Sequence, residues 1–171
     1  MNNITELTGK TIKIVQPSIW KGYFELKHND EVIATMEFFK FRGMNMIFKI
    51  NNKEWEIYWT GFWQQEVAIR EVGYEMPFAK YSKDFFKSKG TIYLPKGEQL
   101  NIAFNLFTGD YRIETLSGQC LVNFEFRFSF KEKAKIYIQQ KSDVLDKYPW
   151  VIAVAWYISL RRKHISAAVI G

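Results

Sequence analysis

The chain has 171 residues, of which 47% are hydrophobic and 25% charged, a balance that excludes an intrinsically disordered protein and fits one globular domain, residues 1–171. Its formal charge of +6 favours polyanionic partners such as anionic lipid or nucleic acid, although a lysine-rich surface also serves solubility alone. Aromatic residues make up 18% of the chain. Because aromatic side chains are enriched in strands and bury large areas, this content indicates a β-rich fold with a bulky interior.

The N-terminus and the cysteine content predict the compartment. The first seven residues, Met-Asn-Asn-Ile-Thr-Glu-Leu, contain neither a basic stretch nor an apolar stretch and do not resemble a secretory signal. A single cysteine, Cys120, excludes an internal disulfide framework and fits a reducing environment. We therefore expect a cytoplasmic protein, and its basic charge extends that expectation to peripheral association with the inner face of the membrane.

Apolar and polar residues alternate with a period of two from Thr11 to Gln140. In the run Cys120–Phe130 every second residue from Val122 to Phe130 is apolar, and the residues between them are polar. Since successive side chains of a strand point to opposite faces, each such run predicts a half-buried strand, and the runs number about twelve. Apolar parities recur at Val32, Ala34, Met36 and Phe38, at Met44, Met46, Phe48 and Ile50, at Trp55, Ile57 and Trp59, at Leu100, Ile102, Phe104 and Leu106, and at Ala134, Ile136 and Ile138.

Turn-forming residues separate these runs. Asn, Asp and Gly tolerate the left-handed backbone of tight hairpins, and strands joined by short links pair antiparallel. One segment, Met76–Gly90, breaks the alternation; a short amphipathic helix and an aromatic loop both fit it, and we favour a loop with one helical turn. The predicted turns are His28-Asn29-Asp30, Asn51-Asn52, Pro95-Lys96-Gly97, Thr108-Gly109-Asp110 and Ser117-Gly118.

A helix is predicted near the C-terminus, within residues 143–160. Ser142 or Asp143 is a suitable N-cap, but Pro149 would then lie inside the helix, so a start at Tyr148 is favoured. Cations suit the negative end of a helix dipole, so the run Arg161-Arg162-Lys163 predicts the end of the helix. Residues 161–171 would then form a short tail that returns as a strand or covers a barrel mouth.

From Trp150 to Leu160 this helix has no polar face, so protein or lipid must bury it on all sides. A membrane span needs about 20 apolar residues, which the segment lacks, and a helix lying on the membrane would show a charged face. A barrel of about twelve strands is wide enough to hold a helix. The fold class predicted is therefore mainly β, a closed antiparallel barrel around a central hydrophobic C-terminal helix. Its core residues would be Trp150, Ile152, Val154 and Trp156.

The order of these elements resembles the tubby C-terminal-like superfamily, which includes tubby proteins, LURP-one-related proteins and phospholipid scramblases. The resemblance rests on the meandering strands, the hairpin Tyr23-Phe-Glu-Leu-Lys to Glu31-Val-Ile-Ala-Thr-Met, and the hydrophobic helix at Pro149–Leu160. It implies a barrel of about twelve strands threaded by its C-terminal helix, and association with phosphoinositides or membranes. No phosphoinositide-binding cation of the family has a matched position here, so none is carried over. The acidic calcium-binding stretch of scramblases is reduced to Asp143 and Asp146.

The sequence carries no constellation that names a reaction. His28 falls in a turn, His164 in a basic tail, and Cys120 at an apolar position of its strand. Glu54 and Glu56 share one strand face, where acids can act as a catalytic pair but more often serve as solvated charges. Metal-ligand spacings and phosphate-binding glycine loops are missing from the sequence. We therefore expect a non-enzymatic protein without metal or cofactor.

Two groups of basic residues are the candidate site for an anion or a lipid headgroup. One group alternates with aromatic residues, and the other ends the buried helix; in each case a purely structural role is the alternative. The expected partner is an anionic phospholipid, a membrane surface or an unidentified protein. A single-stranded nucleic acid stacking on Tyr58, Tyr93, Phe107 and Tyr137, or a small apolar ligand inside an empty barrel, remain alternatives. The candidate cations are Lys80, Lys83, Lys87, Arg161, Arg162 and Lys163.

Overall fold

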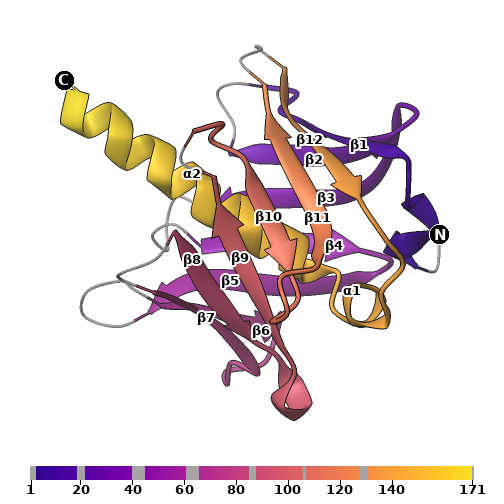
Figure 1. Ribbon diagram of the computed structural model, residues 1–171, viewed down its shortest axis with the longest axis vertical. Helices are drawn as coiled ribbons and strands as arrows, with labels where there is room; N and C mark the ends of the chain where they lie inside the picture. The colour runs from indigo at the N-terminus through magenta and orange to yellow at the C-terminus, as the bar shows by residue number, and fades with distance from the viewer. Residues whose placement is uncertain are drawn as a thin grey trace.

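Twelve antiparallel strands close into a barrel around a helix (Figure 1). The structure, a computed structural model, describes residues 3–18, 22–39, 45–60, 66–84, 88–105, 107–127 and 131–170, with side chains as far as Leu160. Each strand pairs with its neighbours in sequence, and β1 pairs with β12, as the predicted fold class requires. The strands are β1 (Thr11–Val15), β2 (Tyr23–His28), β3 (Glu31–Phe39), β4 (Asn45–Ile50), β5 (Lys53–Thr60), β6 (Glu66–Glu71), β7 (Ala79–Lys83), β8 (Lys89–Tyr93), β9 (Gln99–Phe104), β10 (Tyr111–Glu114), β11 (Cys120–Phe126) and β12 (Glu132–Ile138). Two 3-10 turns, η1 (Ile4–Leu7) and η3 (Pro95–Gly97), and two helices, α1 (Asp143–Lys147) and α2 (Trp150–Ile170), complete the described elements.

The alternation of the sequence positions side chains inside and outside the barrel. In β12, Ala134, Ile136 and Ile138 are buried, whereas Lys133 and Lys135 between them are partly exposed. The predicted inward position of Val32 is wrong, because Val32 is 43% exposed. The pairing of β2 with β3 shifts between Leu26 and Lys27, so this irregularity changes the parity at the start of β3. The expected inward residues Met44, Leu106, Phe128 and Phe130 lie outside the described residues.

Left-handed residues turn the chain where the sequence predicted hairpins. Asn29 and Asp30 have φ of 49° and 66°, and Asn51 and Asn52 have φ of 49° and 61°. Two consecutive left-handed residues give a turn whose twist matches that of the flanking strands. These two turns therefore fix the β2–β3 and β4–β5 hairpins.

The interpretation of Met76–Gly90 as an aromatic loop with a helical turn is wrong. This part of the chain includes β7 and the start of β8, with Tyr81 opposite Ile92. Ala79 and Tyr81 point into the core, and Lys80 lies on the outer face. Gly90 permits this arrangement, because a Cβ atom there would overlap the Tyr81 ring. A residue without a side chain thus provides the space for a large inward aromatic one.

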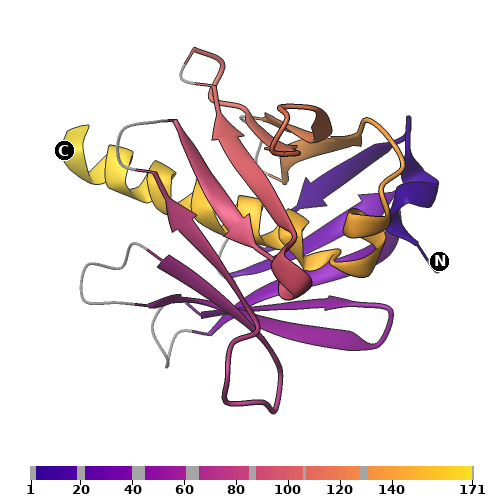
Figure 2. The same cartoon turned by 60° about the horizontal axis from the view of Figure 1, so that its bottom comes forward.

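The first two turns of α2 fill the barrel. Every residue from Trp150 to Tyr157 is buried, which confirms the predicted core residues Trp150, Ile152, Val154 and Trp156. Figure 2 shows the helix passing between the strands and leaving the barrel toward the C-terminus. The sheet thus supplies the enclosure that a helix without a polar face requires.

The helix differs from its prediction at both ends. Pro149 separates α1 from α2, so the break is real, but α2 begins at Trp150 rather than Tyr148. Its end near Leu160 and the separate tail are wrong, because α2 continues to Ile170. Arg, Lys and Ala have high helix propensity, and the segment 161–170 contains neither Pro nor Gly. The three cations therefore continue the helix rather than end it.

The opposite end of the barrel is covered by α1 and η1. The amide of Thr5 donates to Asp146 Oδ1 at 2.9 Å, and the Thr5 hydroxyl donates to Oδ2 of the same carboxylate. Leu145 is fully buried beneath this contact. This end, where α2 begins, is called the entry end below.

Candidate functional site

The helix leaves the barrel through the mouth formed by the ends of the odd-numbered strands. These ends are Val15, Phe39, Thr60, Lys83, Phe104 and Phe126, and the following even-numbered strands begin beside them because all pairings are antiparallel. We call this end of the barrel the exit mouth (Figure 2).

Aromatic rings fill the exit mouth around the helix. The Trp156 ring lies 5.4 Å from Phe24 and 5.7 Å from Phe126, measured between centroids. The Tyr157 ring lies 5.9 Å from Phe38. Such contacts add stabilisation beyond the burial of area. The interior is therefore occupied by the protein's own side chains, which removes the alternative of a carrier with an empty barrel.

One exposed aromatic residue projects from the exit mouth. Phe107, between β9 and β10, is 100% exposed. The side-chain oxygen of Asn105 accepts hydrogen bonds from the amides of Phe107, at 3.0 Å, and Thr108, at 3.4 Å. These bonds are those of an Asx turn, which fixes the local backbone. The chain thus holds a large apolar ring in solvent at the end where α2 emerges.

The predicted cations of β7 have different environments. Lys80 forms an ion pair with Glu66 at 3.1 Å and lies over the Tyr93 ring at 5.7 Å. Lys83 is exposed at the end of β7, on the exit mouth, and has no acidic partner within the described part of the chain. Lys80 is therefore engaged on the barrel wall, whereas Lys83 is available at the mouth. Lys87 lies outside the described residues.

The second predicted group belongs to the part of α2 beyond the enclosed turns. Arg161, Arg162 and Lys163 lie within α2, which continues past them to Ile170. The fold brings the segment that carries them and the end of β7 to the same mouth, a proximity that the sequence did not predict. Phe107 completes this set and was assigned from the sequence only to a nucleic-acid surface. Phe107 follows the odd-numbered strand β9, and in an antiparallel barrel every connection that follows an odd-numbered strand lies at the same end. This position in the sequence could have placed Phe107 at the exit mouth.

Comparison with known proteins adds a shared architecture to this geometry. No family model matches the chain, and no curated protein matches its sequence. An X-ray structure of a protein from Arabidopsis thaliana superposes with a TM-score of 0.59, covering 90% of this chain and 93% of that chain at 8% sequence identity. At this identity the likeness shows the fold alone.

The acidic pair noted in the sequence is held in ion pairs. Arg70 donates to Glu56 Oε2 through Nε at 2.7 Å, and its Nη2 lies 2.6 Å from the same oxygen. Asn45 Nδ2 donates to the other oxygen at 2.7 Å. The hydrogen bond to Glu56 raises the pKa of Arg70 above its ordinary value. Glu54 pairs with Lys49 at 2.8 Å, so both acids have cationic partners and neither is positioned as a free proton donor.

Other chemistry finds little support in the geometry. Burial raises the pKa of the Cys120 thiol, which disfavours the nucleophilic thiolate. Among the described residues, His, Cys, Asp and Glu side chains form no group of three that could hold a metal ion. Within the same residues, no helix has the length and apolar character to cross a membrane.

The proposed stacking platforms do not form one surface. Tyr58 lies on β5 beneath the Arg70 guanidinium at 4.9 Å, and Tyr93 lies on β8 beneath Lys80. Tyr137, on β12, donates to Glu125 at 3.4 Å. These strands are dispersed around the barrel, and Phe107 is at the mouth. A single strand of nucleic acid needs successive rings along one groove.

Proposed function

We propose that the protein binds anionic membrane surfaces through its exit mouth, without catalysing a reaction. The observation that carries the proposal is the fully exposed Phe107 at the mouth from which the basic segment Arg161-Arg162-Lys163 of α2 emerges. Aromatic rings partition into the interface between headgroups and acyl chains, and cations are attracted to anionic headgroups. An exposed aromatic ring beside a cluster of cations therefore suits an anionic membrane surface.

The sequence between the strands that meet at this mouth supports the same proposal. The six segments that join an odd-numbered strand to the next even-numbered one contain nine aromatic residues and six cations, against two acids, Asp84 and Asp110. The aromatic residues are Trp20, Phe41, Phe62, Trp63, Phe85, Phe86, Phe107, Phe128 and Phe130, and the cations are Lys21, Lys40, Arg42, Lys87, Arg127 and Lys131.

The expected strength follows from small increments. Each cation near an anionic surface contributes about 1 kcal/mol, so the three of α2 together supply about 3 kcal/mol. Burying one phenylalanine side chain adds about 1.5–3 kcal/mol. Binding should therefore be reversible and should weaken as salt screens the cations.

Co-sedimentation with vesicles tests the proposal. The protein should bind vesicles of phosphatidylcholine with phosphatidylglycerol and remain in solution with phosphatidylcholine alone. Replacing Arg161, Arg162 and Lys163 together by Gln should weaken binding about 100-fold, and Phe107→Ala about tenfold. Tyr74→Ala is the matched control, because Tyr74 is 67% exposed in the β6–β7 connection at the entry end.

Two outcomes would contradict membrane binding at this mouth. One is the absence of binding to anionic vesicles at any salt concentration. The other is equal weakening by Phe107→Ala and Tyr74→Ala. Retention on single-stranded DNA at physiological salt, without binding to vesicles, would favour the nucleic-acid alternative.

We also propose that the chain is a distant member of the tubby C-terminal-like superfamily. The closed barrel of twelve strands threaded by α2 supports this kinship. The proposed location follows from the same idea: a cytoplasmic protein that associates with the inner face of the membrane. Fractionation of cells should then recover the protein in both soluble and membrane fractions, with salt releasing the second.

A further inference from the structure

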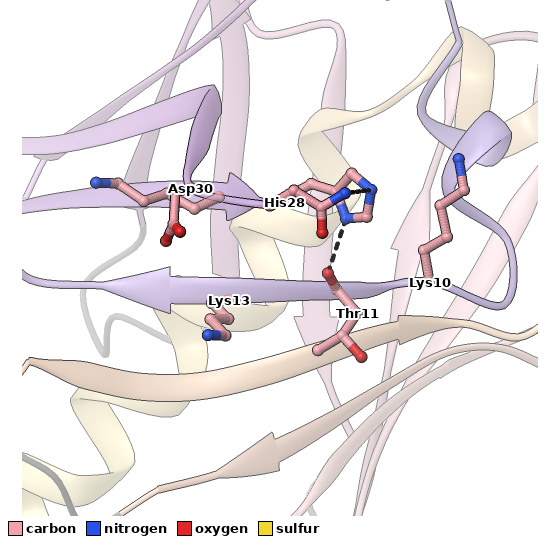
Figure 3. Close-up of a pocket in the computed structure, with 7 residues that line it drawn as sticks. Lys10, Thr11, Lys13, His28 and Asp30 are labelled. Carbon is pink, nitrogen blue, oxygen red and sulfur yellow. Dashed lines mark hydrogen bonds between the residues drawn. The ribbon is translucent and has the colours of Figure 1, made fainter.

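A second polar site lies on the outer wall of the barrel, near the entry end. A hollow of about 560 Å³ opens between the start of β1 and the β2–β3 turn (Figure 3). Lys10, Thr11 and Lys13 line one side, and the run Lys27–Asp30 lines the other. Its lining contains three cations and one acid, so it favours an anion.

The strand register concentrates positive charge here. Lys13 on β1 lies directly opposite Lys27 on β2 and, on its other side, opposite Lys135 on β12. Like charges directly opposite one another destabilise a sheet. Lys27 Nζ lies 3.0 Å from Glu25, but Lys13 Nζ lies 3.8 Å from Glu132, a much looser ion pair.

Lys10 has no acidic partner within 4 Å in the described part of the chain, and Lys135 faces Glu125 across the β11–β12 pairing. Within the lining of the hollow itself, three lysines stand against one acid, and the Lys13–Lys27 pair is a like-charge contact. An anion bound between β1 and β2 would relieve this repulsion.

The histidine in the hollow is held in place by two hydrogen bonds. Its Nδ1 lies 3.1 Å from the carbonyl oxygen of Thr11, which can only accept, so Nδ1 carries the proton. Its Nε2 then accepts from the Asn29 side-chain amide at 3.2 Å. The ring thereby ties the β2–β3 turn to β1. This turn places Asn29 and Asp30 in left-handed conformations at the side of the hollow.

We propose that this hollow binds a phosphorylated polyol, such as a sugar phosphate. Lys10, Lys13 and Lys27 would bind the phosphate through charge-assisted hydrogen bonds. The Asp30 carboxylate repels phosphate but accepts hydrogen bonds from hydroxyl groups, and this distinguishes a polyol phosphate from inorganic phosphate. Because the hollow lies on the wall near the entry end, a membrane bound at the exit mouth does not supply the ligand.

Titration calorimetry with glucose 6-phosphate, glucose and inorganic phosphate tests the proposal. Glucose 6-phosphate should bind more tightly than inorganic phosphate, and glucose should not bind. Replacing Lys13 and Lys27 together by Gln should weaken glucose 6-phosphate binding at least tenfold, because two charge-assisted hydrogen bonds are lost. Lys49→Gln is the matched control, since Lys49 is an outward lysine of β4 paired with Glu54, and it should leave binding unchanged.

Asp30→Asn should affect inorganic phosphate and the sugar phosphate differently. Inorganic phosphate should bind more tightly once the acid is removed, whereas the preference for the sugar phosphate should fall. The melting temperature provides a check on folding: the Lys13 and Lys27 double variant should melt close to the wild type without ligand, because the like-charge contact that it removes offsets the loss of two partly exposed ion pairs.

The same variants distinguish this site from the membrane surface. The Lys13 and Lys27 double variant should bind anionic vesicles as the wild type does, and Phe107→Ala should bind glucose 6-phosphate normally. The absence of binding at millimolar glucose 6-phosphate, or an equal loss with Lys49→Gln, would overturn the proposal. Loss of vesicle binding in the double variant would also overturn it, since the hollow would then serve a lipid headgroup.

Discussion

A carboxyl group placed at position 155 tests the enclosure of α2 most severely. Ala155 is fully buried in the second turn of the helix, within the hydrophobic core of the barrel. In Ala155→Asp the buried carboxyl would remain protonated, because an unpaired charge in this interior is far more costly than neutralisation. Holding an acid of ordinary pKa about 3.9 neutral at pH 7 costs about 4 kcal/mol. The unsatisfied neutral carboxyl adds about 1–3 kcal/mol.

The sum of about 5–7 kcal/mol approaches the whole stability of a typical domain, which is about 5–15 kcal/mol. The loss should depend on pH with a definite sign. Below the unfolded-state pKa of about 3.9 both states are protonated, and only the cost of the neutral group remains. Above it, the raised pKa of the folded state makes the loss grow by about 1.4 kcal/mol per pH unit.

Urea unfolding followed by tryptophan fluorescence, from pH 4.5 to pH 7.5, is the assay. The variant should be folded at the acidic end and unfolded, or nearly so, at neutral pH. Ala155→Ser is the control; its hydroxyl can bond to a helix carbonyl, so its cost should be about 1 kcal/mol and independent of pH. A loss for Ala155→Asp below about 1 kcal/mol, equal at all pH values, would refute the enclosure of the helix.

Two further predictions concern the barrel wall. Arg70→Ala leaves the largely buried Glu56 carboxylate without its cation, and should lower the free energy of unfolding by about 2–3 kcal/mol, measured by urea denaturation; an equal loss for Lys49→Ala, at a more exposed pair, would show that burial is unimportant here. Gly90→Ala forces a methyl group against the hydroxyl and the ring carbons Cε2 and Cζ of Tyr81 and should cost about 1–3 kcal/mol; combined with Tyr81→Leu, which removes the ring, it should cost less than the sum of the two single changes. An unchanged melting temperature for Gly90→Ala would contradict the close packing of β7 on β8.

The sequence was most predictive where one physical requirement dominated. Ala134, Ile136 and Ile138 share one face of their strand, and in a closed sheet an apolar face must point into the barrel. All three side chains are buried there. The apolar turns from Trp150 to Tyr157 likewise required enclosure, and the barrel provides it. In both cases the cost of exposing apolar area exceeds any competing local preference.

Predictions failed where a local signal has two physical readings. Arg161-Arg162-Lys163 suits a helix end through the dipole, but the same residues have high helix propensity, and α2 continues through them. In β7 and β8, the short period-two pattern around Tyr81 was hidden by closely spaced lysines and aromatics. Short strands carry little periodicity, so tertiary pairing determines them.

The sites depend on register, which a single sequence does not specify. Parity alone indicates that Lys13 and Lys27 face outward, but the opposition of Lys13 to both Lys27 and Lys135 appears only when the barrel closes. The irregularity between Ile113 and Glu114 is of the same kind, because it alters the pairing at Cys120 and leaves this residue partly exposed. A bulge of one residue reverses which side chains beyond it point into the barrel, and no residue type in the sequence identifies where it occurs.

Membrane binding through the exit mouth is tested most directly by spin labels at the two ends of the barrel. In a Cys120→Ser background, single labels are attached at Phe107→Cys, beside the exit mouth, and at Met76→Cys, an 81% exposed residue of the β6–β7 connection near the entry end. With the protein bound to phosphatidylglycerol-containing vesicles, paramagnetic relaxation by a lipid-soluble quencher should affect the label at position 107 and spare the label at position 76. Quenching at position 76 but not at position 107 would contradict membrane binding through the exit mouth. So would the absence of quenching at both positions on vesicle-bound protein.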